Sequence, residues 1–202
     1  MDLPFIYKYQ PLFLQDFEMD VKLLELIQIL IKMDNLNILF VGNSGCGKTS
    51  LISAIIRDYY DNVDYKDNVM YINTLKDQGI SYYRSEVKTF CQTSTNIVGK
   101  KKIIILDDLD VINEQSQQVF RNFIDKYSHN VHFIASCANT NKVIESIQSR
   151  MSTIKIKALH AGNLSKILKR ICKIENIFVE SEAEDFILSI SNNSVRILIN
   201  YL

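Results

Sequence analysis

Apolar and polar positions along the chain follow two different patterns, which meet near residue 160. Before that point, short apolar runs alternate with longer segments whose apolar residues recur every three or four positions, as is typical of amphipathic helices. The apolar runs predict strands at 37–41, 69–73, 103–106, 131–136 and 153–157, and the other segments predict helices at 19–33, 50–60, 80–91, 114–127 and 141–148. This alternation indicates a doubly wound, mainly parallel α/β sheet, which holds its ligand at the carboxyl ends of the strands.

After residue 160 the pattern is helical only. Ser181 to Glu184 has the composition of a capping box for the second helix of this part. The last helix runs to Leu202 without a glycine or polar stop signal, so we expect a fragment of a longer protein. The helices are predicted at 163–175, at 181–191 and from 194 onward.

The pattern therefore predicts two domains, an α/β domain over residues 1–160 and an incomplete helical domain over residues 161–202. Residues 1–17 contain both prolines, Pro4 and Pro11, and are predicted to be irregular. Aromatic residues should dock this segment on the domain, and they are Phe5, Tyr7, Tyr9, Phe13 and Phe17.

A glycine-rich segment with the pattern G-x-x-x-x-G-K-S/T lies between the predicted strand 37–41 and the following helix. Glycines let backbone N–H groups close around phosphate oxygens, and the helix N-terminus adds partial positive charge. Lys48 can reach the β- and γ-phosphates of a nucleoside triphosphate, and the Thr49 hydroxyl can hold Mg²⁺. The alternative is a glycine-rich turn with an incidental lysine, but the flanking strand and helix favour nucleotide binding. The predicted nucleotide-binding residues here are Gly42, Asn43, Ser44, Gly45, Cys46, Gly47, Lys48, Thr49 and Ser50.

Two aspartates, Asp107 and Asp108, follow the most apolar run of the chain, 103–106. A run without alternation suits a central parallel strand that is covered on both faces. A carboxylate at the end of such a strand can complete the Mg²⁺ site, which we assign to Asp107. Asp108 is the candidate that polarises an attacking water. The alternative is that both aspartates cap the next helix.

Charge and cysteine content exclude some classes of protein. Of the 202 residues, 47% are hydrophobic and 23% are charged, and the formal net charge is zero, so a uniformly basic nucleic-acid coat is excluded while a local basic face is not. The four cysteines are widely spaced without a C-x-x-C pattern, which predicts reduced thiols.

The three histidines lack metal-ligand spacing and are predicted to lie on the surface or in loops. The run Lys100–Lys102 is predicted to be a solvated loop.

Neither a secretory signal nor a membrane span is predicted. The first residues lack a basic segment followed by a long apolar run. No window approaches the ~18 uncharged apolar residues that a spanning helix needs. We therefore expect an intracellular protein that is not secreted, with nucleus, cytoplasm and a viral replication site all open.

The order of motifs resembles the small subunits of replication factor C, the sliding-clamp loader of the AAA+ ATPases. The opening, Leu3 to Pro11, is similar to that family's L-P-W-V-E-K-Y-R-P, with Gln10 in place of the arginine. Asn73 to Lys88, which includes Gly79 and Ile80, is similar to its L-N-A-S-D-E-R-G-I-x-x-V-R-x-x-I-K segment. Further similar segments are Arg121-Asn122 for R-R, Cys137 to Lys142 for C-N-x-x-S-K, Ile147 to Met151 for I-Q-S-R-C, and Ser194 to Arg196 for the lid's G-D-M-R.

The resemblance implies a P-loop AAA+ core, followed by a helical lid and, in the family, a collar domain that is absent here. It implies ATP and Mg²⁺ as cofactors. Lys8, Tyr9 and Pro11 would border the adenine. Arg150 would be an arginine finger that completes a neighbouring subunit's site, and Arg196 would sense the γ-phosphate in this subunit's own site.

The implied partners are other clamp-loader AAA+ subunits in a hetero-oligomeric ring, a sliding clamp, and primer–template DNA. Arg84, Lys88 and Arg121 would contact DNA phosphates without reading sequence. A solvated helix face is the alternative for Arg84 and Lys88.

Two catalytic positions depart from the family pattern. Asp108 replaces a glutamate and is one methylene shorter. The sensor asparagine falls on Ala138, with Asn139 one position later, and Asn139 can substitute only if the strand has already ended.

Three hypotheses follow. The chain is a motor subunit that loads a clamp by ATP binding and hydrolysis, or a scaffold subunit that binds ATP, hydrolyses little and supplies Arg150 in trans. The third is another AAA+ protein, a replication initiator or helicase loader.

Overall fold

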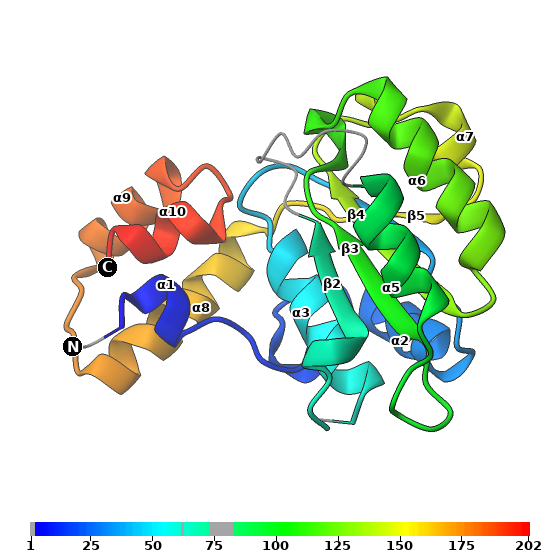
Figure 1. The fold of residues 1–202 in the computed structure, drawn as a ribbon. Coiled ribbons are helices and arrows are strands. Elements are labelled where there is room, and N and C mark those ends of the chain that lie inside the picture. The colour runs from blue at the N-terminus through cyan, green and yellow to red at the C-terminus, as the bar shows by residue number, and fades with distance from the viewer. Residues whose placement is uncertain (1–2, 62, 73–82) are drawn as a thin grey trace.

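A five-stranded parallel sheet forms the centre of the larger unit, with strand order β2-β3-β4-β1-β5 (Figure 1). The structure, a computed structural model, describes residues 3–61, 63–72 and 83–202. The predicted doubly wound, mainly parallel sheet is confirmed. The strands are β1 (Ile38–Val41), β2 (Val69–Ile72), β3 (Lys102–Leu106), β4 (Val131–Cys137) and β5 (Ser152–Lys155).

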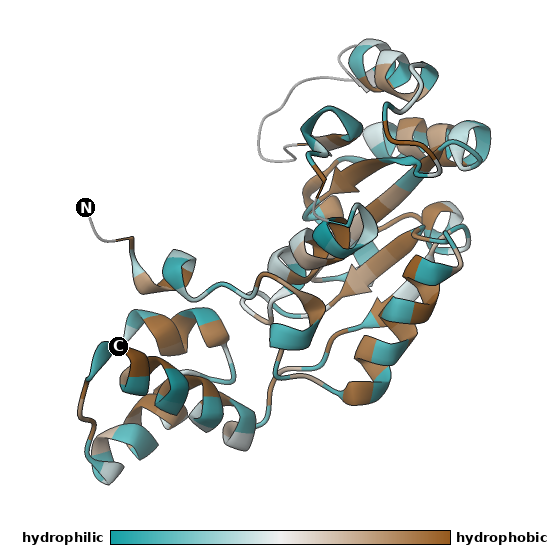
Figure 2. Cartoon of the chain, turned by 90° about the horizontal axis from the view of Figure 1, so that it is seen from below, coloured by the Kyte–Doolittle hydropathy of each residue, from teal (hydrophilic) through white to brown (hydrophobic). Residues whose placement is uncertain are grey.

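Alternate residues of the strands supply two separate cores, one on each face of the sheet. In β3, Ile103 and Ile105 belong to one core, and Ile104 and Leu106 belong to the other. Both faces are covered, so the strand has no polar alternation. Figure 2 shows hydrophobic residues gathered on the strands and on the helix faces that are turned toward them.

Helices α2 (Val21–Lys32) and α3 (Lys48–Tyr59) cover one face of the sheet. The other face is covered by α5 (Lys88–Gln92), α6 (Glu114–Tyr127) and α7 (Glu145–Gln148). No helix among the described residues is long and apolar enough to cross a membrane.

Two of the predicted helices on the second face differ from the structure. The one predicted at 80–91 is a π-helical turn, Tyr83–Val87, that leads into α5, while residues 80–82 lie outside the described residues. The one predicted at 141–148 is a 3₁₀ turn, Thr140–Lys142, followed by α7, because Val143 and Ile144 have extended ψ values of 126° and 138°.

The smaller unit consists of α8 (Ala161–Glu175), α9 (Ser181–Ile190) and α10 (Val195–Asn200), which enclose a third core. The prediction that only helices follow residue 160 is confirmed. The predicted capping box is wrong, because Glu180 is the N-cap of α9 and makes no side-chain cap. The last helix ends at Asn200 and does not reach Leu202.

The predicted irregularity of residues 1–17 is also wrong in part. A short helix, α1 (Phe5–Lys8), and a 3₁₀ turn, Leu14–Asp16, lie in this segment. A four-residue helix is not stable by itself. Phe5, Ile6 and Tyr9 pack on the third core, and the Leu14 side chain enters the core beneath α3, so the segment joins the two units.

At the amino ends of the strands, a polar cluster overturns two further predictions. His132 is buried at the start of β4; its Nδ1 accepts the Leu36 N–H (3.4 Å), so its Nε2 carries a proton and donates to Asp34 (2.9 Å). Tyr59 (2.7 Å) and Lys101 (2.9 Å) also contact the Asp34 carboxylate.

The run Lys100–Lys102 is not a solvated loop. Lys100 pairs with Asp61 (2.9 Å), and Lys102 is buried in β3, where its ammonium donates to Thr93 and to the Phe90 carbonyl. Burial of Lys102 lowers the pKa of its ammonium.

Stability should depend on pH through His132. Burial lowers the pKa of His132, and the Asp34 carboxylate offsets part of this effect. An unfolded histidine takes a proton near pH ~6.5. The unfolded chain therefore binds a proton more readily than the folded chain, and the free energy of unfolding should fall as the pH drops below that value.

Urea unfolding of the wild type and of His132→Gln at pH 7 and pH 5 tests this expectation, and the loss of stability should be smaller in the variant. His129→Gln, at an exposed position, is the matched control. Equal pH dependence in all three proteins would contradict it.

The Asp34 carboxylate titrates in a separate, more acidic range than His132. Burial would raise the pKa of Asp34, but hydrogen bonds from Lys101, His132 and Tyr59 lower it to about 2.

A buried amide connects α6 to the loops at its N-terminal end. Gln117 Nε2 donates to the carbonyls of Ile112 (2.9 Å) and Lys142 (2.9 Å) and, at 3.4 Å, to that of Leu109, while its Oε1 accepts the Ile144 N–H (2.9 Å). The one side chain thereby satisfies backbone groups of the segments that precede and follow β4 in the sequence.

Gln117→Ala should lower the free energy of unfolding by about 3 kcal/mol, because several buried backbone groups lose their partner. Chemical denaturation measures this loss. Gln118→Ala, at an exposed position of the same helix, should change stability by less than about 0.5 kcal/mol. Similar losses in the two variants would mean that the amide does not support the loops.

Candidate nucleotide site

The loop between β1 and α3 closes around its own lysine. Gly45 (φ 78°) and Gly47 (φ 94°) have left-handed backbones that favour glycine, and Gly47 is the N-cap of α3. Lys48 is only 7% exposed, and its Nζ donates to the carbonyls of Gly42 (2.7 Å) and Asn43 (3.1 Å). The lysine is thus held at the centre of the loop, where phosphate oxygens could accept hydrogen bonds from the ammonium.

The tip of this loop contacts the helical unit. A Cβ atom placed on Gly45 would lie 2.2 Å from the Oγ of Ser194, the N-cap residue of α10. No side chain fits between them. The loop backbone at Gly45 therefore packs directly against the Ser194 side chain at the start of α10.

The two predicted metal ligands meet at the carboxyl end of the sheet. The Thr49 hydroxyl donates to Asp107 Oδ2 (2.8 Å), and Ser136 in β4 donates to Asp107 Oδ1. A hydroxyl and a carboxylate are oxygen donors that suit Mg²⁺, which binds few protein groups and keeps several waters. The pair therefore fits Mg²⁺, although no cluster of three acidic, histidine or cysteine ligands exists among the described residues.

Ser136 was not predicted as a site residue. It is fully buried, and besides its contact with Asp107 it accepts the Asp108 N–H (3.1 Å). The signal was a hydroxyl near the end of a buried strand next to the strand that carries Asp107. Its use depends on β3 and β4 being neighbours, which the sequence does not specify.

Asp108 faces the cations of the site. Burial raises the pKa of Asp108, the neighbouring Asp107 and Asp110 carboxylates raise it further, and Lys48 and Arg196 lower it. Its backbone is left-handed (φ 54°), an uncommon conformation for a residue with a side chain.

The alternative that Asp107 and Asp108 cap the helix that ends at 127 is wrong, although Asp108 is the N-cap residue of a 3₁₀ turn, Leu109–Val111, without a side-chain cap. Helix α6 begins at Glu114, and its cap is Asn113, which accepts the Ser116 N–H (2.9 Å).

A cavity of about 610 Å³ lies between the two units and brings the phosphate loop, Asp108 and Arg196 together. The N-terminal segment forms one wall and the helical unit another. Lining residues that were predicted are Tyr9, Pro11, Ser44, Gly45, Cys46, Gly47, Lys48, Thr49, Ser50, Asp108 and Arg196. Lining residues that were not predicted include Gln10, Phe17, Met19, Ala138, Leu159, Ile167, Arg170, Val195 and Ile199.

The N-terminal segment contacts both the helical unit and the α/β unit. Lys8 does not line the cavity but pairs with Glu175 of α8, which also accepts the Tyr9 hydroxyl. Gln10 does line the cavity, and its Nε2 donates to the Ser50 hydroxyl (3.2 Å). The segment is thereby tied both to α8 and to the start of α3.

Asn139 stands outside this cavity. Strand β4 ends at Cys137, so the strand has ended before Asn139, but the Asn139 side chain accepts the Asn141 N–H (2.9 Å) and caps a 3₁₀ turn. Ala138 lines the cavity instead.

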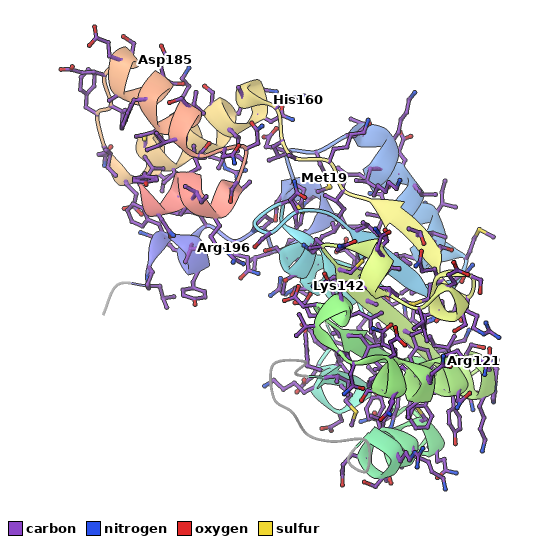
Figure 3. All side chains as sticks on the ribbon, turned by 90° about the horizontal axis from the view of Figure 1, so that it is seen from above. Met19, Arg121, Lys142, His160, Asp185 and Arg196 are labelled. Carbon is purple, nitrogen blue, oxygen red and sulfur yellow. The ribbon has the colours of Figure 1, made fainter. Side chains whose placement is uncertain are left out.

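The remaining predicted site residues lie elsewhere on the surface. Arg84 and Lys88 are exposed on successive turns before and within α5, whereas Arg121 and Arg150 both pair with Asp125. Figure 3 shows Arg196 on the helical unit and Arg121 on the opposite side of the molecule, on α6. Asn73, Gly79 and Ile80, which carried part of the resemblance, lie outside the described residues.

Comparison with known proteins gives one family and one group of relatives. Residues 38–158 match the family described as ATPase family associated with various cellular activities (AAA). A replication factor C small subunit of Methanococcus vannielii is 30% identical over the whole chain and 64% of its own length. Replication factor C subunit 3 of Schizosaccharomyces pombe is 30% identical over 99% of the chain and 58% of its own length.

A putative replication factor C small subunit of Acanthamoeba polyphaga mimivirus is 29% identical over 99% of the chain and 62% of its own length. The chain thus spans about three fifths of these relatives. Among solved structures, the RuvB Holliday junction branch migration motor of Thermotoga maritima superposes with a TM-score of 0.75 at 14% identity, over 95% of this chain and 63% of that one. At that identity the likeness concerns the fold alone.

Proposed function

This chain belongs to the AAA family of ATPases and is similar along its whole length to replication factor C small subunits, and from that premise we propose that it is an ATP-binding subunit of a sliding-clamp loader. It uses ATP binding and hydrolysis to load a polymerase clamp onto primer–template DNA. The observation that carries the proposal is the 610 Å³ cavity, in which the phosphate loop, Asp108 and Arg196 meet between the two units.

Within this proposal, ATP binds with its phosphates in the loop Gly42–Thr49. Thr49 and Asp107 hold Mg²⁺, and Asp108 orients the attacking water. Lys8, Tyr9 and Pro11 border the adenine, with Lys8 acting through its contact with α8. Arg196 senses the γ-phosphate, and Asn139 is the candidate sensor after β4.

The partners belong to the proposal as well. They are other AAA+ subunits in a hetero-oligomeric ring, a sliding clamp, and DNA bound through its phosphates. Arg84 and Lys88 are the preferred DNA contacts, because both are exposed and neither has a partner among the described residues. Arg121 is a weaker candidate because Asp125 already holds it at 3.3 Å. The site of action is a replication site in the nucleus or cytoplasm.

A second candidate is a scaffold subunit that binds ATP, hydrolyses little and donates Arg150 to a neighbour. Three observations favour it. Ala138 lines the cavity without a polar side chain, and the Asn139 side chain is engaged in a local cap. Asp108 is also one methylene shorter than glutamate, and a misplacement of ~1 Å can lower a rate by about 100-fold.

Mass spectrometry of what co-purifies with the tagged protein at moderate salt tests the proposal first. Other AAA+ subunits and a sliding clamp would support it. An origin-binding protein or a helicase would overturn it and favour an initiator or helicase loader.

Turnover in the purified assembly separates motor from scaffold. If the subunit is a motor, Asp108→Asn should remove the turnover of its own site. If it is a scaffold, Asp108→Asn should leave total turnover nearly unchanged.

A further inference from the structure

We infer that Asp125 is a positioning residue for Arg150, which it holds on the outer surface of the α/β unit in an orientation suited to a neighbour's nucleotide. The inference rests on the proposed trans role of Arg150. Asp125 lies in the last turn of α6, and Arg150 follows α7. Neither residue lines the subunit's own cavity.

The guanidinium of Arg150 is fixed by two of its three nitrogens. Nε donates to Asp125 Oδ1, and Nη1 donates to the Ser146 carbonyl (2.7 Å). Among the described residues Nη2 has no hydrogen-bond partner, and 30% of the side chain is exposed. One edge of the planar group is therefore anchored while the other remains available to a phosphate oxygen.

Asp125 also contacts a second cation. Its second oxygen, Oδ2, lies 3.3 Å from the Nε of Arg121, one turn earlier on α6. The carboxylate thus pairs with two guanidinium groups, but within the described part of the chain only Arg150 donates a hydrogen bond to it, whereas the buried Arg121 Nε makes an ion-pair contact without a hydrogen bond. The hydrogen bond from Arg150 lowers the pKa of Asp125 below its ordinary value.

Such anchoring matters for a residue that acts across an interface. A free arginine loses rotamer freedom when it is immobilised, and a misplacement of ~1 Å can lower a rate by about 100-fold. With Asp125 in place, the Arg150 side chain is already partly ordered before the neighbouring subunit binds. Without it, Arg150 keeps its charge but loses the partner that orients its Nε edge.

The test compares Asp125→Asn, Asp125→Glu and wild type in the assembly with its co-purified partner subunits. Asp125→Asn should lower kcat for ATP by about 10-fold while KM changes by less than about twofold, because orientation and not ground-state binding is lost. Asp125→Glu, which keeps the carboxylate, should restore part of kcat. Glu114→Gln, an exposed carboxylate at the start of the same helix, is the control and should leave kcat unchanged.

Two further measurements separate positioning from a purely structural role. In an Arg150→Ala background, Asp125→Asn should have no additional effect on kcat. In the isolated chain, the Arg150 Nε–H resonance should shift and exchange faster in Asp125→Asn. An unchanged resonance, or additive losses in the double variant, would overturn the inference.

The outcomes also distinguish this inference from the proposed function. If Arg150→Ala lowers turnover but neither Asp125 variant does, positioning by Asp125 is refuted and the trans role of Arg150 stands. If Arg150→Ala leaves turnover unchanged, the trans role is refuted and the inference is refuted with it.

Discussion

Lys48→Met is expected to weaken ATP binding by at least ~100-fold, because loss of a desolvated charge partner costs about 3 kcal/mol or more. Lys48 is 7% exposed, and its ammonium is held at the centre of the phosphate loop by the Gly42 and Asn43 carbonyls. Methionine has a similar length but carries neither charge nor donors. Titration calorimetry with ATP and Mg²⁺ measures the change.

The control for this variant is Lys22→Met, at an exposed position of α2 on the same unit. It removes the same charge at a residue that does not line the cavity, so ATP affinity should be unchanged. Thermal unfolding of both variants excludes a folding defect. Tight ATP binding by Lys48→Met would place the phosphates elsewhere and contradict the proposed site.

Arg150→Ala is expected to lower turnover at a neighbouring subunit's site by about 10³-fold, the loss that follows removal of an arginine finger. The physical reason is that a guanidinium near the γ-phosphate stabilises transition-state charge. ATP binding by the variant chain itself should not change, since Arg150 does not line its own cavity. Steady-state turnover of the assembly, with subunits mixed one variant at a time, measures the effect.

Lys126→Ala provides the matched control for Arg150, because Lys126 is an exposed cation next to Asp125 on α6. Removing it changes the charge of the same surface without touching the arginine. If Lys126→Ala and Arg150→Ala lower turnover equally, the surface acts through its overall charge and the finger is disproved.

Much of the fold was predictable because the signals are local. Runs such as Ile103–Leu106 allow only a doubly covered strand, and the amphipathic period of α6 gave its bounds of 114–127. The short helices were mispredicted because their formation depends on contacts that are distant in sequence or on local backbone angles. Helix α1 exists only through its packing on the third core, and α7 is shortened by extended residues that no period reveals.

Some residues of the candidate site could likewise be predicted from local sequence, and others could not. The phosphate loop is contiguous in sequence, and the meeting of Thr49 with Asp107 follows from the rule that parallel strands end at one edge of the sheet. The apolar wall of the cavity, for example Ile167 and Val195, comes from a different unit, and its placement depends on how the two units pack. His132 was misjudged because its partner, Asp34, lies 98 positions away.

The contact between Gly45 and Ser194 has a consequence for how the sequence can vary. A Cβ atom at position 45 would lie 2.2 Å from the Ser194 Oγ, so any other residue there would need the Ser194 hydroxyl to move and would also adopt a left-handed backbone. A side chain at position 45 therefore needs a compensating shift at position 194, and effects at such touching positions are not additive. The two positions, 149 residues apart, form a single unit of mutational tolerance that spans the boundary between the α/β and helical units.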